Sequence, residues 1–240
     1  MVRGVRHPWP SVLFVGLLLL AYEGGLAWWA QHRGEAPPRC GVEQWLRYGC
    51  VAAGVAFVCP VLPLVVISPL VLAAVLAWPR RPASVGAALL GIIGESLCAA
   101  LVLWIVSRNF GWLCERCGLP LALPGQEATW IRLLCLIGAG IYEEIIFRFG
   151  LFTLLYIGMR LLLFPWLLAL PVAAVLAATL FAAAHHLGPW GEPWRSDYFL
   201  FRLLAGLYFT LLYVWRGLGV SVGTHVAYDL FVGLSQPGSV

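Results

Sequence analysis

Six side chains in the second half of the chain have the chemical types that hydrolases use, and all of them lie in or at the end of apolar runs. They are Glu143, Glu144, Arg148, His185, His225 and Asp229. Ionisable groups inside membrane-length apolar runs are costly and indicate a functional site. A carboxylate there can take a proton from water, and the hydroxide can attack a carbonyl carbon while donors stabilise the oxyanion. The set therefore predicts hydrolysis.

The spacing gives the two adjacent glutamates different surroundings on a helix. Glu144 and Arg148 are four residues apart and meet on one face, so that the pair neutralises a buried charge. Glu143 points about 100° away from Glu144 and is free to face a cavity. His225 and Asp229 are also four residues apart, which lets the carboxyl group orient the imidazole.

Two other chemistries use the same residue types. Histidines and carboxylates can bind a Zn²⁺ ion that activates water, although the sequence contains no H-E-x-x-H pattern. Ser221, His225 and Asp229 have the residue types of a serine triad. On one helix they would stack in a poor geometry for attack on an incoming carbonyl, so we disfavour the triad.

Further polar and small residues lie in the apolar runs. Glu23 and Glu95 have no charged partner close in sequence, and we interpret them as interhelical hydrogen-bonding or pore-lining groups. Small residues allow neighbouring helices to approach closely. Those near the candidate site are Gly138, Gly140, Gly219, Gly223 and Ala227.

The composition defines the class of protein. Of 240 residues, 62% are hydrophobic and 11% are charged, with a net charge of +4 and a mean hydropathy of +0.89. Soluble domains carry about 25% charged residues. A soluble core, a disordered chain and a nucleic-acid-binding protein are therefore excluded. We predict one integral, multi-pass membrane domain over residues 1–240.

The apolar runs predict an all-α bundle of transmembrane helices. A span needs about 20 residues, and two of the runs are longer than that. Pro60, Pro63 and Pro69 could divide one of these longer runs, so we expect seven or eight spans. No alternating pattern favours strands. The runs are 11–30, 49–78, 84–106, 131–163, 166–187, 198–215 and 217–235.

Short basic segments predict the orientation. Arg3 and Arg6 precede the first run, and residues 79–82 contain two more arginines. If the loop 31–48 lies on the opposite side, both segments face the cytoplasm, and so does the N-terminus. The arginines of that loop count against this assignment. We expect a cell membrane of the bacterial type.

The loop 107–130 would then face away from the cytosol. It contains Cys114 and Cys117 in a C-x-x-C pattern, which by itself is at best half of a zinc site. A disulfide in an oxidising compartment is the interpretation that we prefer.

Three ordered motifs resemble those of the CAAX-protease and bacteriocin-processing (CPBP, or Abi) family of intramembrane proteases. They are Glu143-Glu144-x-x-x-Arg148, Phe181-x-x-x-His185 and His225-x-x-x-Asp229. The resemblance covers residues 131–235, which we take as the catalytic core. It implies a bundle of about eight helices around a polar cavity.

The resemblance also implies a site and a substrate class. Glu143 would activate water, assisted by His185. The oxyanion-binding side would be formed by His225 and Asp229. Glu144 and Arg148 would hold the first motif in place. The partners would be the lipid bilayer and a protein or peptide substrate, which can be lipidated, cleaved near its C-terminus as in CAAX proteins. We prefer a mechanism without a metal and keep Zn²⁺ as the alternative.

One residue departs from part of the family. Eukaryotic CAAX-processing members carry Asn at the position of Asp229, and an ionised aspartate cannot donate to an oxyanion. Asp229 must therefore be protonated, orient His225 or bind a metal.

Two other function classes stay open. A transporter could relay protons or ions through the glutamates, although no inverted repeat is present. A catalytically idle protein on the same fold is the other. The protease hypothesis requires Glu143, His185 and His225 to meet around one water, although straight spans could leave them at depths that differ by roughly 10 Å.

Overall fold

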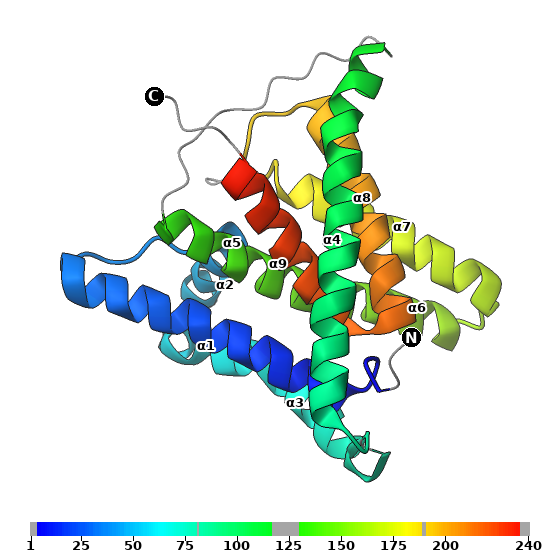
Figure 1. Cartoon of the computed structure of the whole chain (residues 1–240), viewed down its shortest axis with the longest axis horizontal. Helices are drawn as coiled ribbons and strands as arrows, with labels where there is room; N and C mark the ends of the chain where they lie inside the picture. Colours follow the sequence, from blue (N-terminus) through cyan, green and yellow to red (C-terminus); the bar gives the residue numbers. More distant parts are fainter. Residues whose placement is uncertain (1–3, 81, 117–129, 189–190, 236–240) are drawn as a thin grey trace.

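Every regular element in the described part of the chain is helical, as predicted. The computed structural model describes residues 4–80, 82–116, 130–188 and 191–235, with the backbone alone for 111–116. The helices are α1 (Pro8–Arg33), α2 (Gly41–Ala52), a 3-10 helix (Ala56–Val61), α3 (Leu62–Leu76), a 3-10 helix (Trp78–Arg80), α4 (Val85–Arg116), α5 (Trp130–Glu143), a π-helix (Glu144–Phe152), α6 (Thr153–Leu161), α7 (Trp166–Ala184), α8 (Ser196–Arg216) and α9 (Leu218–Ser235) (Figure 1).

Capping side chains and glycines with positive φ mark the ends of some of these helices. The His7 side chain accepts a hydrogen bond from Trp9 N at 3.1 Å and caps the start of α1. Gly34, with φ of 67°, ends the same helix in the left-handed conformation. Gly217, with φ of 87°, alone joins α8 to α9. This tight connection makes α8 and α9 direct neighbours.

One continuous helical rod contains the first motif. It runs through α5, the π-helix and α6, in close agreement with the predicted apolar run 131–163. The π-helix begins at Glu144, immediately after Glu143. Single stretches of π-helix inside α-helices are frequent at functional sites, because the wider turn re-aims side chains. The local geometry therefore changes at the two glutamates.

Helix α9 forms the centre of the bundle. It packs against α1, α4, α5 and α8, and all its residues from Leu218 to Val226 are buried. Figure 1 shows α9 enclosed between α5 and α4. The third motif thus lies in the protein interior.

Glycines make the close contacts around α9 possible, as predicted. A Cβ atom on Gly140 would lie 2.9 Å from the backbone nitrogen of Val226 in α9. A Cβ atom on Gly223 would lie 2.3 Å from Ser96 Oγ in α4. These distances leave no room for a methyl group. Gly140 of α5 thus allows α5 to approach α9, and Gly223 of α9 allows α4 to do so.

The segment 31–48, which we predicted as a loop, is an exception. It contains most of α2, whose Glu43 side chain is fully buried. The signal was present in the sequence: Arg39 and Arg47 lie four residues on either side of Glu43, the spacing of ion pairs on a helix. Two of the three arginines that opposed the orientation argument are thus partners of this buried carboxylate.

Two other boundaries differ from the prediction. The run 49–78 is interrupted at Gly54, with φ of 75°, and its spanning part is Ala56–Leu76. Helix α4 continues to Arg116, ten residues past the predicted end of its run. The predicted Cys114–Cys117 disulfide lies outside the described residues.

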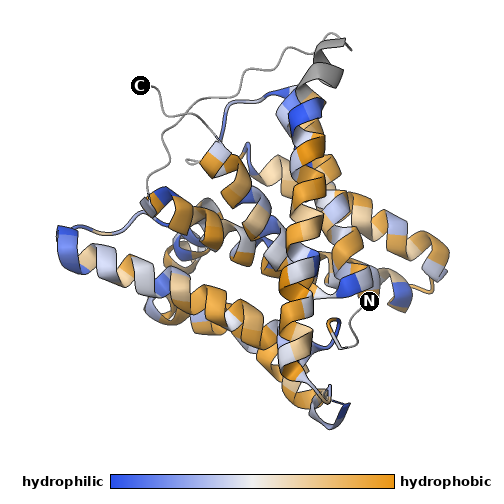
Figure 2. Ribbon diagram, viewed as in Figure 1, coloured by the Kyte–Doolittle hydropathy of each residue, from blue (hydrophilic) through white to orange (hydrophobic). Residues whose placement is uncertain are grey.

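Five helical segments in the described ranges are long and apolar enough to cross a membrane. They are Pro8–Arg33, Ala56–Leu76, Val85–Phe110, Trp166–Ala184 and Ser196–Arg216. Figure 2 shows apolar residues along the lengths of α1, α4 and α7, with hydrophilic residues mainly near helix ends. Seven or eight spans remain a prediction.

The start of α1 and the end of α3 lie at the same end of the bundle. His7 Nε2 is 3.2 Å from the carbonyl oxygen of Ala77, and the rings of Trp9 and Trp78 are 4.7 Å apart. The basic segments around Arg6 and Arg80 therefore share one end, as the orientation argument requires. A cytoplasmic N-terminus remains a prediction.

The close contact at Gly140 generates a stability prediction. Gly140→Ala should lower the free energy of unfolding by about 1–3 kcal/mol, because the new methyl group meets the α9 backbone. Melting of the detergent-solubilised protein, followed by tryptophan fluorescence, measures the change. Gly94→Ala is the control, since nothing lies within 4 Å of its Cβ position. Equal melting temperatures for the two variants would contradict the packing argument.

Candidate active site

The six predicted residues come together from three parts of the fold. Glu143 ends α5, and Glu144 and Arg148 lie in the π-helix. His185 caps the C-terminal end of α7, and His225 and Asp229 lie in α9. These residues form two connected layers, a buried one around Glu144 and a cavity-facing one around Glu143.

The carboxylate of Glu144 organises the buried layer. Its Oε1 atom lies 3.0 Å from Arg148 Nη1 and 2.8 Å from His225 Nδ1. Its Oε2 atom accepts a hydrogen bond of 2.6 Å from Ser221 Oγ. Glu144 is completely buried. One carboxylate thus connects the π-helix to α9, and the predicted Glu144–Arg148 pair is present.

Aromatic rings and a backbone carbonyl enclose the Arg148 guanidinium. It lies over the Phe181 ring at 4.2 Å and near the Phe209 ring at 5.2 Å. Its Nη2 atom donates to the Gly206 carbonyl oxygen at 3.4 Å. Cation–π contacts strengthen when water is excluded. The cation is therefore sealed in the interior, where it compensates the charge of Glu144.

Glu143 faces the other way and reaches both motif histidines. Its Oε2 atom is 3.8 Å from His185 Nε2 and 3.7 Å from His225 Nε2. These separations are too long for direct hydrogen bonds and suit a bridging water molecule. Glu143 is 8% exposed and lines a cavity. The convergence that the hydrolytic hypothesis requires is present.

Second contacts fix the orientation of both imidazole rings. His185 Nδ1 lies 2.8 Å from the Phe181 carbonyl oxygen, which can only accept a hydrogen bond. His225 Nδ1 lies 2.8 Å from Glu144 Oε1. In each ring Nδ1 therefore carries a proton, and Nε2 is directed toward Glu143. Phe209 stacks on the His225 ring, with centroids 4.4 Å apart.

Asp229 does not orient His225 in the manner that its spacing suggested. Its Oδ2 atom lies 3.6 Å from His225 Nε2, beyond hydrogen-bond range, whereas Glu144 holds the Nδ1 side. The residue that orients the imidazole is therefore Glu144. Sequence spacing missed this contact because it joins residues 81 positions apart.

The disfavoured serine triad is incompatible with the contacts of Ser221. Its hydroxyl lies 2.6 Å from Glu144 Oε2 and 3.0 Å from the Phe209 carbonyl oxygen. Neither partner is His225, which would have to act as the base. Ser221 contributes to the buried layer instead.

The expected difference in depth between Glu143, His185 and His225 does not occur, because the helices are inclined to one another. In Figure 1, α7 crosses the bundle at a steep angle to α4, so that its C-terminal end lies inside the molecule. His185 at this end can therefore meet Glu143 in the middle of its rod.

The cavity in front of Glu143 has a volume of about 370 Å³. Helix α2 supplies an apolar wall of Val42, Trp45 and Leu46. His185 and Glu192 lie on the side of α7. Sequence reasoning missed both α2 and Glu192, since neither belongs to an apolar run.

Polar contacts with α1 hold α2 and the residues just before it against the bundle. Glu43 accepts hydrogen bonds from Tyr22 Oη at 2.7 Å and from Arg47 Nε at 2.7 Å, and it also pairs with Arg39. Arg39 Nη1 lies 3.4 Å from Glu23. Glu23 is thus an interhelical hydrogen-bonding group, and Glu95, which pairs with Arg216, is another.

A buried cysteine lies beside this wall and is not suited to nucleophilic attack. Cys40, just before α2, is only 4% exposed. Burial raises the pKa of the Cys40 thiol above its ordinary value, which disfavours the reactive thiolate. The candidate reactive groups of the cavity are therefore its carboxylate and imidazole side chains.

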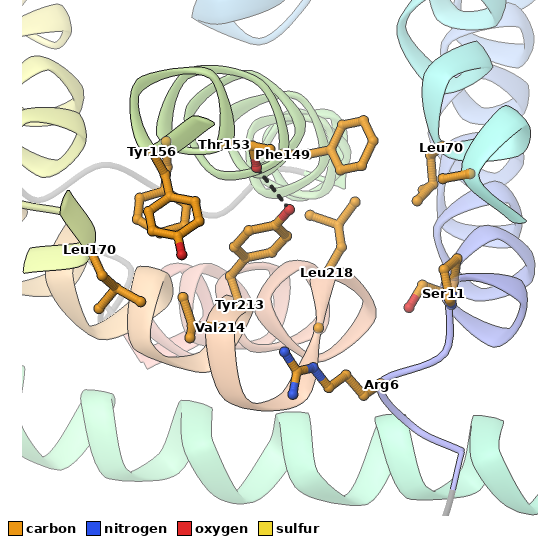
Figure 3. Close-up of a pocket in the computed structure, with 14 residues that line it drawn as sticks. Arg6, Ser11, Leu70, Phe149, Thr153, Tyr156, Leu170, Tyr213, Val214 and Leu218 are labelled. Atoms are coloured by element: carbon orange, nitrogen blue, oxygen red, sulfur yellow. Dashed lines mark hydrogen bonds between the residues drawn. The ribbon is translucent and has the colours of Figure 1, made fainter. Parts of the chain in front are cut away.

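A second cavity, of about 400 Å³, is separate from this chemistry. It is lined by residues from α1, α3, the π-helix, α6, α7, α8 and α9, and none of the six predicted residues contributes to it. Figure 3 shows its polar edge, where Thr153 and Tyr213 are hydrogen-bonded at 3.0 Å and Arg6 approaches from the chain start. The candidate site is the smaller cavity, because chemistry requires the reactive groups.

The zinc alternative has a geometric test. Over the described ranges, no group of three or more His, Cys, Asp or Glu side chains is placed to hold a metal ion. We therefore derive no step through a metal.

The family comparison agrees with the motifs. Residues 125–231 match the family described as Type II CAAX prenyl endopeptidase Rce1-like, a segment that contains all six predicted residues. Comparisons with curated proteins and with solved structures gave no match. This match confirms the resemblance over residues 125–231, and the five long apolar helices agree with an integral membrane protein. Helix α2 lies outside the matched segment.

The two adjacent glutamates should differ in their effect on stability. Glu144→Gln should lower the free energy of unfolding by about 3–5 kcal/mol, because it leaves the buried Arg148 charge uncompensated. Glu143→Gln should change it by less than about 0.5 kcal/mol, since its nearest polar partners lie beyond 3.5 Å. Thermal melting in detergent compares the two. A larger loss for Glu143→Gln would contradict the two-layer description.

Proposed function

We propose that this protein is an intramembrane endopeptidase in which Glu143 activates a water molecule for attack on a peptide bond. The observation that carries the proposal is the meeting of one carboxylate oxygen with two imidazole Nε2 atoms at 3.8 and 3.7 Å. One water can contact all three atoms. The fully enclosed Glu144 layer keeps the two rings directed at that point.

The roles of the three groups follow from their hydrogen-bonding capacity. Glu143 Oε2 removes a proton from the water. His185, whose Nδ1 proton is committed to the Phe181 carbonyl, offers the Nε2 lone pair to the water and orients it. The hydroxide attacks the carbonyl carbon. His225, protonated on both ring nitrogens in this scheme, donates a hydrogen bond from Nε2 to the developing oxyanion and keeps its proton.

The second half of the reaction returns each group to its starting state. The proton held by Glu143 passes to the amide nitrogen as the carbon–nitrogen bond breaks, so the products are a carboxylic acid and an amine. Glu144 and Arg148 take no proton in this scheme. They are positioning residues that hold His225 through the 2.8 Å contact to its Nδ1.

The cavity supports a membrane-associated or C-terminal, CAAX-like peptide as the substrate. The apolar wall of Val42, Trp45 and Leu46 suits an uncharged segment of peptide. The cavity belongs to a bundle whose outer faces carry exposed leucines, such as Leu90 and Leu161. A lipidated protein can reach such a site from the bilayer.

Loss of either the Glu143 carboxylate or the His185 imidazole should strongly reduce cleavage. Glu143→Gln and His185→Ala should each lower kcat/KM by about 10²–10⁴. The measurement follows hydrolysis of a farnesylated CAAX-type peptide by purified protein in lipid vesicles. Glu35→Gln alters an exposed glutamate outside the cavity and serves as the control. Normal cleavage by both active-site variants would refute the proposed function.

A metal-independent mechanism predicts resistance to chelators. Prolonged incubation with 1,10-phenanthroline or EDTA should leave the cleavage rate unchanged, and elemental analysis should find much less than one zinc per chain. The alternative would be established by loss of activity on chelation and its recovery on addition of Zn²⁺, but not of Mg²⁺.

A further inference from the structure

An arginine beside the active site has donors that the fold does not use. Arg202, on α8, donates from Nη2 to both carboxylate oxygens of Glu192 at 2.8 Å. Its Nη1 atom is buried and has no hydrogen-bond partner among the described residues. Leaving a buried donor unsatisfied is unfavourable, and such groups in native proteins need an explanation.

Glu192, the partner of Arg202, lies at the polar end of the cavity. Glu192 lines this cavity together with Glu143 and His185. The backbone nitrogen of Glu192 donates to the His185 carbonyl oxygen at 2.8 Å, so the two residues are held side by side. The guanidinium of Arg202 is therefore one ion pair away from the cavity lining that holds the reacting groups.

The surrounding charges explain why a cation is needed there. Glu143 and Glu192 line the cavity and give it an acidic character, which would repel an anionic group of a substrate. Arg148 cannot compensate, because it is sealed beneath two aromatic rings and paired with Glu144. Arg202 is 19% exposed, and its partner Glu192 is 48% exposed.

An arginine guanidinium is the side chain best suited to a carboxylate. Its planar fork can bind two oxygen atoms at once, and one arm of Arg202 is unused. The half-exposed Glu192 carboxylate shows that the other arm accepts such a group in this position. A mobile carboxylate from a substrate can join or replace it.

We propose that Arg202 binds the free C-terminal carboxylate of the peptide substrate, while Glu192 occupies the guanidinium in the resting protein. The inference rests on the proposed function and deepens it. A cation fixed near Glu143 would hold the C-terminus of the substrate a short distance from the scissile bond. The protein would then remove a short C-terminal peptide rather than cut within long chains.

A matched pair of substrates tests this assignment. Two farnesylated CAAX-type peptides, identical except for a free carboxylate or an amide at the C-terminus, are given to the protein in lipid vesicles. The variants are Arg202→Gln and Glu192→Gln. Arg160→Gln is the control, because Arg160 is an exposed arginine in the last turn of α6.

The expected result is a preference that depends on Arg202. The unaltered protein and Arg160→Gln should cleave the acid at least about tenfold more efficiently than the amide, mainly through a lower KM. Arg202→Gln should bring the ratio to within about twofold while still cleaving the amide. Glu192→Gln should lower the KM for the acid, because it removes the competing carboxylate.

Other outcomes separate this inference from the proposed function. Equal cleavage of acid and amide by the unaltered protein would overturn the role of Arg202 and leave the peptidase intact. A retained preference in Arg202→Gln would do the same. A merely structural ion pair would make Arg202→Gln and Glu192→Gln behave alike on both peptides, which also overturns it. Cleavage of neither peptide would reject the proposed function, and this inference with it.

Discussion

The structure depends on one buried carboxylate that has three partners. Glu144 contacts Arg148, Ser221 and His225 at 3.0, 2.6 and 2.8 Å, and it is completely enclosed. A charge in such a place is tolerated only when it is compensated and its hydrogen bonds are satisfied. These contacts fix the rotation of the π-helix against α9. The direction of Glu143 and of the His225 ring follows from them.

The neighbouring glutamates divide structural and chemical tasks because a helix turns between them. Glu144 faces the interior, and Glu143 faces the cavity, where its nearest polar partners leave space for water. A reactive carboxylate needs oxygen atoms that are free to accept a hydrogen bond from water. A structural carboxylate needs all its hydrogen bonds to be made within the protein. The close packing at Gly140 and Gly223 brings the helices near enough for both layers to exist.

Local spacing and apolar runs predicted much of this arrangement. The Glu144–Arg148 pair, the cavity-facing Glu143 and the small-residue contacts of α9 follow from helical periodicity. The contact of Glu144 with His225 and the inclination of α7 do not, because they depend on tertiary packing between distant segments. Helix α2 is not predicted because its polar composition resembles that of a loop, although Glu43 has its partners at helical spacing. Arg202 and Glu192 were missed because neither lies in a motif.

The position of α2 has a consequence for how such enzymes can diversify. The groups that would break the bond lie in the segment matched by the protease family, whereas Val42, Trp45 and Leu46 come from before it. Mutations in that earlier region can reshape the surface presented to a substrate without moving a reactive atom. Selectivity and catalysis can therefore evolve in separate parts of the gene. The buried contact between Glu43 and Tyr22 keeps α2 in place while they do so.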